Sequence, residues 1–112
     1  MQREQRFVES GTLAWEELGG GLKRQLLTFD DNLMMVKVAF DAGGVGALHT
    51  HPHTQMSYVE SGRFTIRIDG VDRELAAGDA YYIPPHVPHG AVCLEAGVLI
   101  DVFTPMRADF VL

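Results

Sequence analysis

The chain has few of the features that mark nucleic-acid-binding, membrane-spanning or disulfide-stapled proteins. Its 112 residues include 9 Lys and Arg against 15 Asp and Glu, a formal net charge of −6, so a nucleic-acid backbone is not an expected partner. No stretch approaches the roughly 20 apolar residues of a membrane-spanning helix. The single cysteine, Cys93, cannot form an internal disulfide. It lies in an apolar run, where we expect a packed core thiol.

The N-terminal stretch 1–6 is polar and leads into no apolar segment of the kind found in secretory signals. We therefore expect a cytoplasmic protein. Hydrophobic residues make up 46% of the chain and charged residues 21%, the composition of an ordinary globular domain. This length can bury a core without staples. No linker interrupts the chain, so we expect one barrel domain over residues 21–112, preceded by an N-terminal extension over residues 1–20.

Short strand patterns dominate the sequence. Residues 63–68 alternate between polar and apolar, and the Asp69-Gly70 pair after them is a strong hairpin signal. Only Thr12–Leu18 has a helical pattern, and the three glycines that follow would end it. Roughly seven to ten short strands predict an all-β sandwich or small barrel that could hold one small ligand. The other predicted strands are 20–27, 33–40, 56–60, 71–75, 80–83, 89–94 and 98–103.

All five histidines fall within residues 49–53 and 86–89. His49 and His51 are two residues apart, a spacing that places both on one face of a strand. Gln55 follows closely, and His89 comes much later in the chain. Imidazole nitrogens and an amide oxygen suit a borderline divalent metal. The clustering predicts a mononuclear metal site, and the alternative is a set of surface loop histidines.

The spacing of these residues resembles that of the cupins. The first cupin motif, Gly-x5-His-x-His-x3-4-Glu-x6-Gly, is matched by Gly43, His49, His51, Gln55 and Gly62. The second, Gly-x5-Pro-x-Gly-x2-His-x3-Asn, is matched by Gly78, Pro84 and His89. Gln55 replaces the glutamate, His86 the second glycine and Cys93 the asparagine.

The cupin resemblance implies an all-β, single-domain double-stranded β-helix, or jelly-roll barrel. It also implies one divalent transition metal ion held by His49, His51, Gln55 and His89. Nickel, zinc, iron, cobalt and manganese all fit such donors. His53 and His86 are expected at the rim of the site. The alternative for His53 is a role as a metal ligand. Gln55 has an alternative role as an amide that only orients a ligand histidine.

A narrower resemblance covers nearly the whole chain. Four segments are similar to the KdgF pectin-degradation cupins, in which glutamine is the normal fourth ligand. They are Asp31–Met34, Gly46–His53, Cys93–Leu99 and Asp101–Arg107. Those enzymes open and ketonise the 4,5-unsaturated monouronates released from pectin and alginate. The resemblance implies an isomerase or intramolecular lyase that converts this small-molecule substrate into the linear 5-keto-4-deoxyuronate.

The last predicted strand would supply the other half of such a site. Alternation places Leu99, Asp101 and Phe103 on one face. A carboxylate in an apolar strand is costly to bury without a partner or a role. The resemblance makes Asp101 a catalytic acid or base, and the alternative is a structural Asp paired with an arginine or a backbone amide.

Arg107 would bind the substrate carboxylate through its planar guanidinium, unless it is a surface or salt-bridging arginine near the C-terminus. Phe103 would form an apolar wall against the sugar ring, although a plain core phenylalanine would look the same in the sequence. Two other functions remain open: a small metal-dependent cupin oxygenase or cyclase, and a non-catalytic sugar-binding cupin. We expect a homodimer, with neither nucleic acid nor membrane as a partner.

Overall fold

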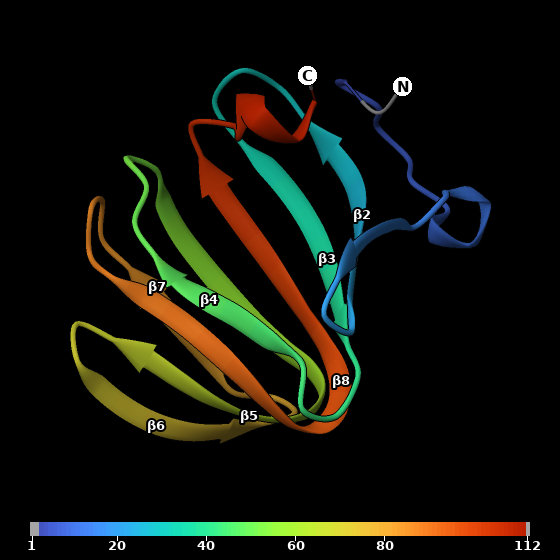
Figure 1. Cartoon of the computed structure of the whole chain (residues 1–112). Helices are drawn as coiled ribbons and strands as arrows, with labels where there is room; N and C mark the ends of the chain where they lie inside the picture. The colour runs from blue at the N-terminus through green and yellow to red at the C-terminus, as the bar shows by residue number, and fades with distance from the viewer. Residues whose placement is uncertain (1–2, 112) are drawn as a thin grey trace.

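The computed structural model describes residues 3–111. Its eight strands form one antiparallel sheet that folds over on itself (Figure 1). Two 3-10 turns, Ser10–Thr12 and Ala108–Phe110, flank the strands, and none of the described helices is long and apolar enough to cross a membrane. The all-β jelly roll expected from the sequence is confirmed. The strands are β1 Glu16–Gly19, β2 Leu22–Phe29, β3 Met34–Phe40, β4 Val45–His49, β5 Thr54–Ile68, β6 Val71–Ala76, β7 Ala80–Ile83 and β8 His89–Thr104.

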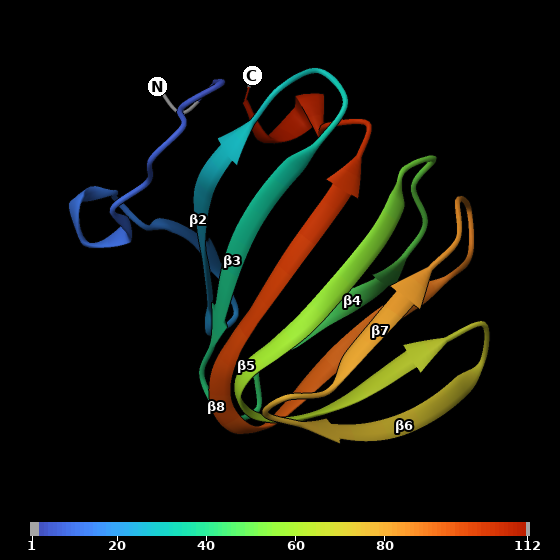
Figure 2. The same ribbon diagram turned by 180° about the vertical axis from the view of Figure 1, so that it is seen from behind.

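The two long strands β5 and β8 pair with each other and bend together, so that each passes through both halves of the barrel (Figure 2). The first half of β5 pairs with β7 and its second half with β6. The second half of β8 pairs with β3 and its first half with β4. The sequence prediction of separate strands at 56–60 and 63–68, and at 89–94 and 98–103, is therefore wrong in number. Each pair is one bent strand.

The bend depends on two glycines at which the backbones of β5 and β8 almost touch. A Cβ atom on Gly97 would lie 2.1 Å from the carbonyl oxygen of Ser61, and one on Gly62 would lie 2.5 Å from the oxygen of Glu95. Gly62 also has a φ of 80°, which favours glycine. The pairing register shifts at this point. The bend therefore needs two residues without side chains.

We expect Gly97→Ala to destabilise the fold by about 3 kcal/mol or more, because its Cβ would overlap backbone atoms that cannot move aside. Thermal unfolding of the purified variant measures the effect. Gly11→Ala is the matched control, since a Cβ there meets no atom within 4 Å. A Gly97→Ala protein as stable as the control would mean that the bend does not depend on this contact.

The segment 12–18 was expected to be helical, and this is wrong. Residues Glu16–Gly19 form β1, in which Glu16 pairs with Arg24 of β2. The hydrogen bonds to the neighbouring strand β2 outweigh the local helical preference of this segment. β4 was not among the predicted strands either, although the histidine motif was expected on a strand. The division of the chain at residue 20 stays a prediction.

Apolar side chains fill the barrel in two clusters. One contains Phe40, Val59, Phe64, Ile66, Cys93 and Leu99, and the other contains Phe29, Met34, Val36 and Phe103. Cys93 is 2% exposed, and burial raises the pKa of its thiol. It is the core thiol that the sequence predicted rather than a nucleophile. The two clusters hold the strands that supply the polar residues described next.

Candidate metal centre and cavity

Three histidines meet inside one end of the barrel. His49, the last residue of β4, pairs across the sheet with His89, the first residue of β8. His51 lies in the turn between β4 and β5. The nitrogen atoms of all three that could bind a metal lie within 4.8 Å of one another. The expectation that His49 and His51 share a strand face is wrong, because β4 ends at His49 and the following turn brings His51 back to the cluster.

A backbone carbonyl fixes the orientation of each imidazole. Nδ1–H of His49 donates to Ala47 O at 2.7 Å, that of His51 to His53 O at 3.1 Å, and that of His89 to Val87 O at 2.9 Å. A carbonyl can only accept, so the proton of each neutral ring is on Nδ1. The Nε2 atoms are left with lone pairs, which is the arrangement of metal-binding histidines.

The fit to a cation is clearest at His51 and Gln55. His51 Nε2 lies 2.9 Å from Gln55 Oε1, while Gln55 Nε2 donates to Ser57 Oγ at 2.9 Å. Ser57 in turn donates to Asp101, so its oxygen needs the amide as a donor, which fixes the orientation of Gln55. Two lone pairs therefore face each other at about the spacing of donors bound to one ion at ~2.1 Å. Nε2 of His89 is likewise buried without a hydrogen-bond partner among the described residues.

Burial favours the neutral form of two of these rings. It lowers the pKa of His89 to about 4 and also lowers that of His51, in both cases mainly through desolvation. An imidazole must be neutral to bind a metal. The folded protein thus presents two of the rings in their metal-binding form at neutral pH. The donor set of three imidazoles and one amide oxygen fits a divalent transition metal.

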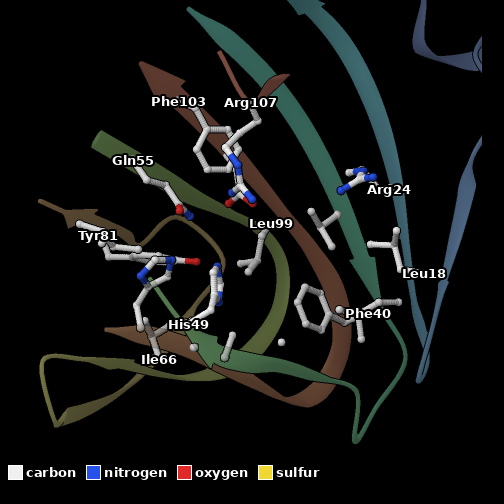
Figure 3. A pocket seen from close by; sticks show the side chains of 18 of the residues that line it. Leu18, Arg24, Phe40, His49, Gln55, Ile66, Tyr81, Leu99, Phe103 and Arg107 are labelled. Carbon is white, nitrogen blue, oxygen red and sulfur yellow. The ribbon is translucent and has the colours of Figure 1, made fainter. Parts of the chain in front are cut away.

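A cavity of about 240 Å³ lies inside the barrel beside the histidine cluster (Figure 3). This is below the roughly 300–1,000 Å³ of drug-sized pockets, so the cavity suits a small molecule. Its wall is largely apolar, and its polar lining consists of Arg24, His49, Gln55, Tyr81, His89, Asp101 and Arg107. Leu99, Asp101 and Phe103 of β8 all line it. The alternation predicted for this strand is therefore what the structure has.

Asp101 lies beside the histidine cluster, at the end of a short hydrogen-bonded chain that runs through Gln55 and Ser57. It pairs across the sheet with Ser57, whose hydroxyl donates to its Oδ1 at 2.6 Å. Desolvation raises the pKa of Asp101 to about 6, against the opposing effect of this hydrogen bond. No ion pair of the described residues involves Asp101, so it lacks the arginine partner considered as one structural alternative. Burial also raises the pKa of Tyr81, which contacts Ser57.

Arg107 and Phe103 form the wall next to Asp101. The guanidinium of Arg107 lies 5.2 Å from the centre of the Phe103 ring and 4.4 Å from that of Phe110. Its Nε and Nη2 bind the two carboxylate oxygens of Asp109 at 3.1 and 2.9 Å. The side chain is 14% exposed. Arg107 is therefore a cavity arginine that is salt-bridged to an acid at the rim, and its binding of a substrate carboxylate stays a prediction.

Several residues of the cavity were not found from the sequence. Ser57, Tyr81, Arg24 and Phe110 carry no motif. The first three reach the site through their places in the folded sheet, and Phe110 through the 3-10 turn after β8. The rim histidines differ: the ring centres of His53 and His51 are 5.4 Å apart, and burial lowers the pKa of His53. His86 is exposed and has a φ of 67°. Neither belongs to the group of three histidines described above.

A small all-β barrel with a histidine cluster inside one end is the architecture of a cupin. The cupin domain model matches residues 36–103 of this chain, and the chain belongs to the cupin family. Within the cupins it groups with the pectin degradation protein KdgF. The KdgF of Dickeya dadantii (strain 3937) is 49% identical over 106 residues, which cover 93% of this chain and 96% of that protein.

Solved structures agree with this assignment. The structure of KdgF from Halomonas sp. superposes with a TM-score of 0.90 at 39% identity, covering 93% of this chain and 96% of the other. An RmlC-like cupin from Shewanella frigidimarina superposes with a TM-score of 0.95 at 50% identity, covering 98% and 99%. In each comparison the similarity therefore covers nearly the whole of both chains.

Proposed function

We propose that this protein catalyses the metal-dependent ring opening and ketonisation of 4,5-unsaturated monouronates derived from pectin or alginate. The observation that carries the proposal is one cavity lined by His49, His89, Gln55 and the perturbed carboxyl of Asp101, with His51 completing the histidine cluster beside it. The similarity to pectin degradation proteins supports the substrate class.

The reaction is an isomerisation. The substrate has a C4=C5 double bond conjugated to its carboxylate, and its ring oxygen on C5 makes it an enol ether. Loss of the C1 hydroxyl proton breaks the bond between C1 and the ring oxygen, leaving a C1 aldehyde and an enolate at C5. Protonation at C4 then gives the linear 5-keto product. One group must accept a proton, one must donate a proton, and the developing negative charge needs stabilisation.

In our proposal His49, His51, His89 and Gln55 hold the metal ion. A divalent ion bound there would supply Lewis acidity for the enolate oxygen, and the neutral ligands would leave its charge undiminished. A glutamate in place of Gln55 would reduce that charge. The same neutrality disfavours the alternative of dioxygen chemistry, for which iron sites more often use a carboxylate ligand.

Asp101 is the proton-transfer group in this proposal. Its raised pKa of about 6 makes both protonation states accessible near neutral pH, as acid–base catalysis requires. The Ser57 hydroxyl donates a hydrogen bond to Oδ1 of Asp101. In this proposal Oδ2 of Asp101 faces the substrate. Arg107 holds the substrate carboxylate through its guanidinium. Phe103 is an apolar wall that excludes water and lies edge-to-face against His51, with ring centres 5.7 Å apart.

The test uses metal-loaded protein and unsaturated monouronate freshly made by a lyase. We expect the ultraviolet absorbance of the conjugated double bond to decay faster than without protein, because the ring also opens spontaneously. A chelator should abolish the acceleration, and added metal should restore it. Decay at the spontaneous rate would contradict the proposal. Oxygen uptake by the iron-loaded protein would then favour an oxygenase, and sugar binding without turnover would favour a binding module.

We also propose that the protein is a homodimer and acts in the cytoplasm. The outer face of the sheet formed by β3, β8, β5 and β7 carries a cross-strand row of apolar residues, Met35, Val102, Met56 and Tyr82. Met56 is 58% exposed and Tyr82 52%. Tyr58 and Ile100 extend this row on the same face. An exposed apolar face of this kind can pack against its own copy around a two-fold axis.

We expect Met56→Lys to convert the dimer into a monomer, because it places a charge at the centre of this apolar row. Light scattering coupled to size-exclusion chromatography measures the mass. Val71→Lys is the control, since Val71 is 52% exposed but lies on β6 in the other half of the barrel. A wild-type protein that is monomeric at micromolar concentration, or a Met56→Lys protein that remains dimeric, would contradict this surface.

A further inference from the structure

A second arginine lines the same cavity. Arg24 is on β2, where its neighbours on the same face of the strand, Leu22 and Leu26, pack against the two core clusters. Its side chain is 15% exposed and lines the cavity. Figure 3 shows Arg24 extending from β2 toward the side where Arg107 lies. A guanidinium on the inner face of a barrel strand is unusual unless it has a partner or a role.

Its protein partner does not explain this position. Nε and Nη2 of Arg24 both donate to one carboxylate oxygen of Glu16, at 3.1 and 2.8 Å. Glu16 is the directly opposite residue on β1, and its side chain is 61% exposed. Such a solvent-screened ion pair contributes little to stability. An arginine pointing outward could form the same pair, as Arg67 does with Asp72, its cross-strand neighbour on β6.

Arg24 and Arg107 are arranged alike around one ring. The guanidinium carbon of Arg24 lies 3.8 Å from the centre of the Phe110 ring, and that of Arg107 lies 4.4 Å from the same point. The two carbons are therefore no farther apart than the sum of these distances. Each arginine uses Nε and Nη2 for an exposed acid, Glu16 or Asp109, and the hydrogen bonds of the described residues leave Nη1 of both without an acceptor.

We propose that Arg24 is a substrate-binding residue that holds the uronate carboxylate together with Arg107. A carboxylate has two oxygens, and two Nη1 groups approaching from different walls can each donate to one of them. Phe110 keeps the two cations in place through its π face and does not itself neutralise them. This inference rests on the proposed function for the identity of the substrate. The anion-binding chemistry of the pair stands without it.

The test measures carboxylate recognition directly. Calorimetry with metal-loaded protein compares galacturonate, a saturated uronate without the reacting double bond, with galactose, its neutral counterpart. Arg24→Gln should weaken galacturonate binding by roughly 10- to 100-fold, the loss expected for one charge-assisted hydrogen bond, and leave galactose binding unchanged. With unsaturated monouronate the same variant should raise KM by a similar factor and change kcat by less than about threefold. Arg24→Lys should fall between the two proteins, because it keeps the charge but loses the planar fork.

Two control variants separate substrate binding from a structural role. Arg67→Gln removes a cross-strand arginine–carboxylate pair outside the cavity and should leave both sugars unaffected. Glu16→Gln removes the acid but keeps the guanidinium, so galacturonate binding should be equal to or tighter than in the wild type. The inference is overturned if Arg24→Gln binds galacturonate as well as Arg67→Gln does, if it loses galacturonate and galactose equally, or if Glu16→Gln loses as much as Arg24→Gln.

The outcome also separates this inference from the proposed function. If the wild type does not accelerate ring opening but Arg24→Gln still loses galacturonate selectively, the proposed reaction is wrong and the two-arginine site remains. If the wild type accelerates ring opening and Arg24→Gln has an unchanged KM, the reaction stands and the role of Arg24 is wrong.

Discussion

Replacing His51 with alanine is expected to reduce turnover of unsaturated monouronate by about 10³-fold or more, to near the spontaneous rate. The ring centre of His51 lies 5.6 Å from that of His49 and 4.7 Å from that of His89, and its Nε2 lies 2.9 Å from Gln55 Oε1, so its loss removes the donor that connects the imidazoles to the amide. A Lewis acid contributes several kcal/mol to such a reaction. Elemental analysis after dialysis should show that the variant has lost stoichiometric metal along with the activity.

His86→Asn is the matched control for this experiment. His86 is also a histidine of the loops around the site, but it is exposed, and asparagine tolerates its positive φ better than alanine would. It should keep full metal content and turnover. Circular dichroism should show both variants folded, because His51 is not a member of either apolar cluster. A His51→Ala protein with wild-type metal and turnover would place the reaction elsewhere.

The candidate metal-binding residues could be proposed because most of their spacing is local. His49, His51 and Gln55 lie close together in the sequence, and only His89 had to be joined to them by the fold. Even so, the reason given for His49 and His51 was wrong. A turn, rather than a shared strand, brings His51 to the cluster, and the short spacing is compatible with both.

The hydrogen-bonded chain at Asp101 could not be predicted because it depends on strand register. Ser57 and Asp101 are opposite residues on β5 and β8, and a shift of one residue in that pairing would turn one of them away. The same holds for Arg24, which reaches the cavity only because β2 forms one of its walls. Non-local pairing also decided that Glu16–Gly19 is a strand and that β5 and β8 are continuous through their glycine bends.

Asp101→Asn is expected to lower kcat by about 10²- to 10⁴-fold with the metal still bound. Asparagine has nearly the same shape and can accept the hydrogen bond from Ser57, but it can neither take nor give the proton. KM should change much less, because Arg107 would still bind the carboxylate. Stopped-flow absorbance measures kcat and KM, and elemental analysis measures the bound metal. Ser57→Ala, which removes the group that orients Asp101, should show a smaller loss. Full turnover by metal-bound Asp101→Asn would make the assignment wrong.

The same substitution should stabilise the metal-free protein. Folding raises the pKa of Asp101 from an ordinary value of 3.8 to about 6, so the folded state favours the protonated form. Stability is therefore lost as the pH rises from 3.8 through about 6, by at most about 3 kcal/mol at pH 8. Asparagine does not ionise, so Asp101→Asn should melt at a higher temperature than the wild type at pH 8, and the difference should shrink toward pH 4. A wild type that is the more stable protein at pH 8 would show that the buried carboxylate is stabilising, as in an ion pair. The expected opposite result would mean that the fold tolerates a destabilising charge where the proposed reaction needs a proton carrier.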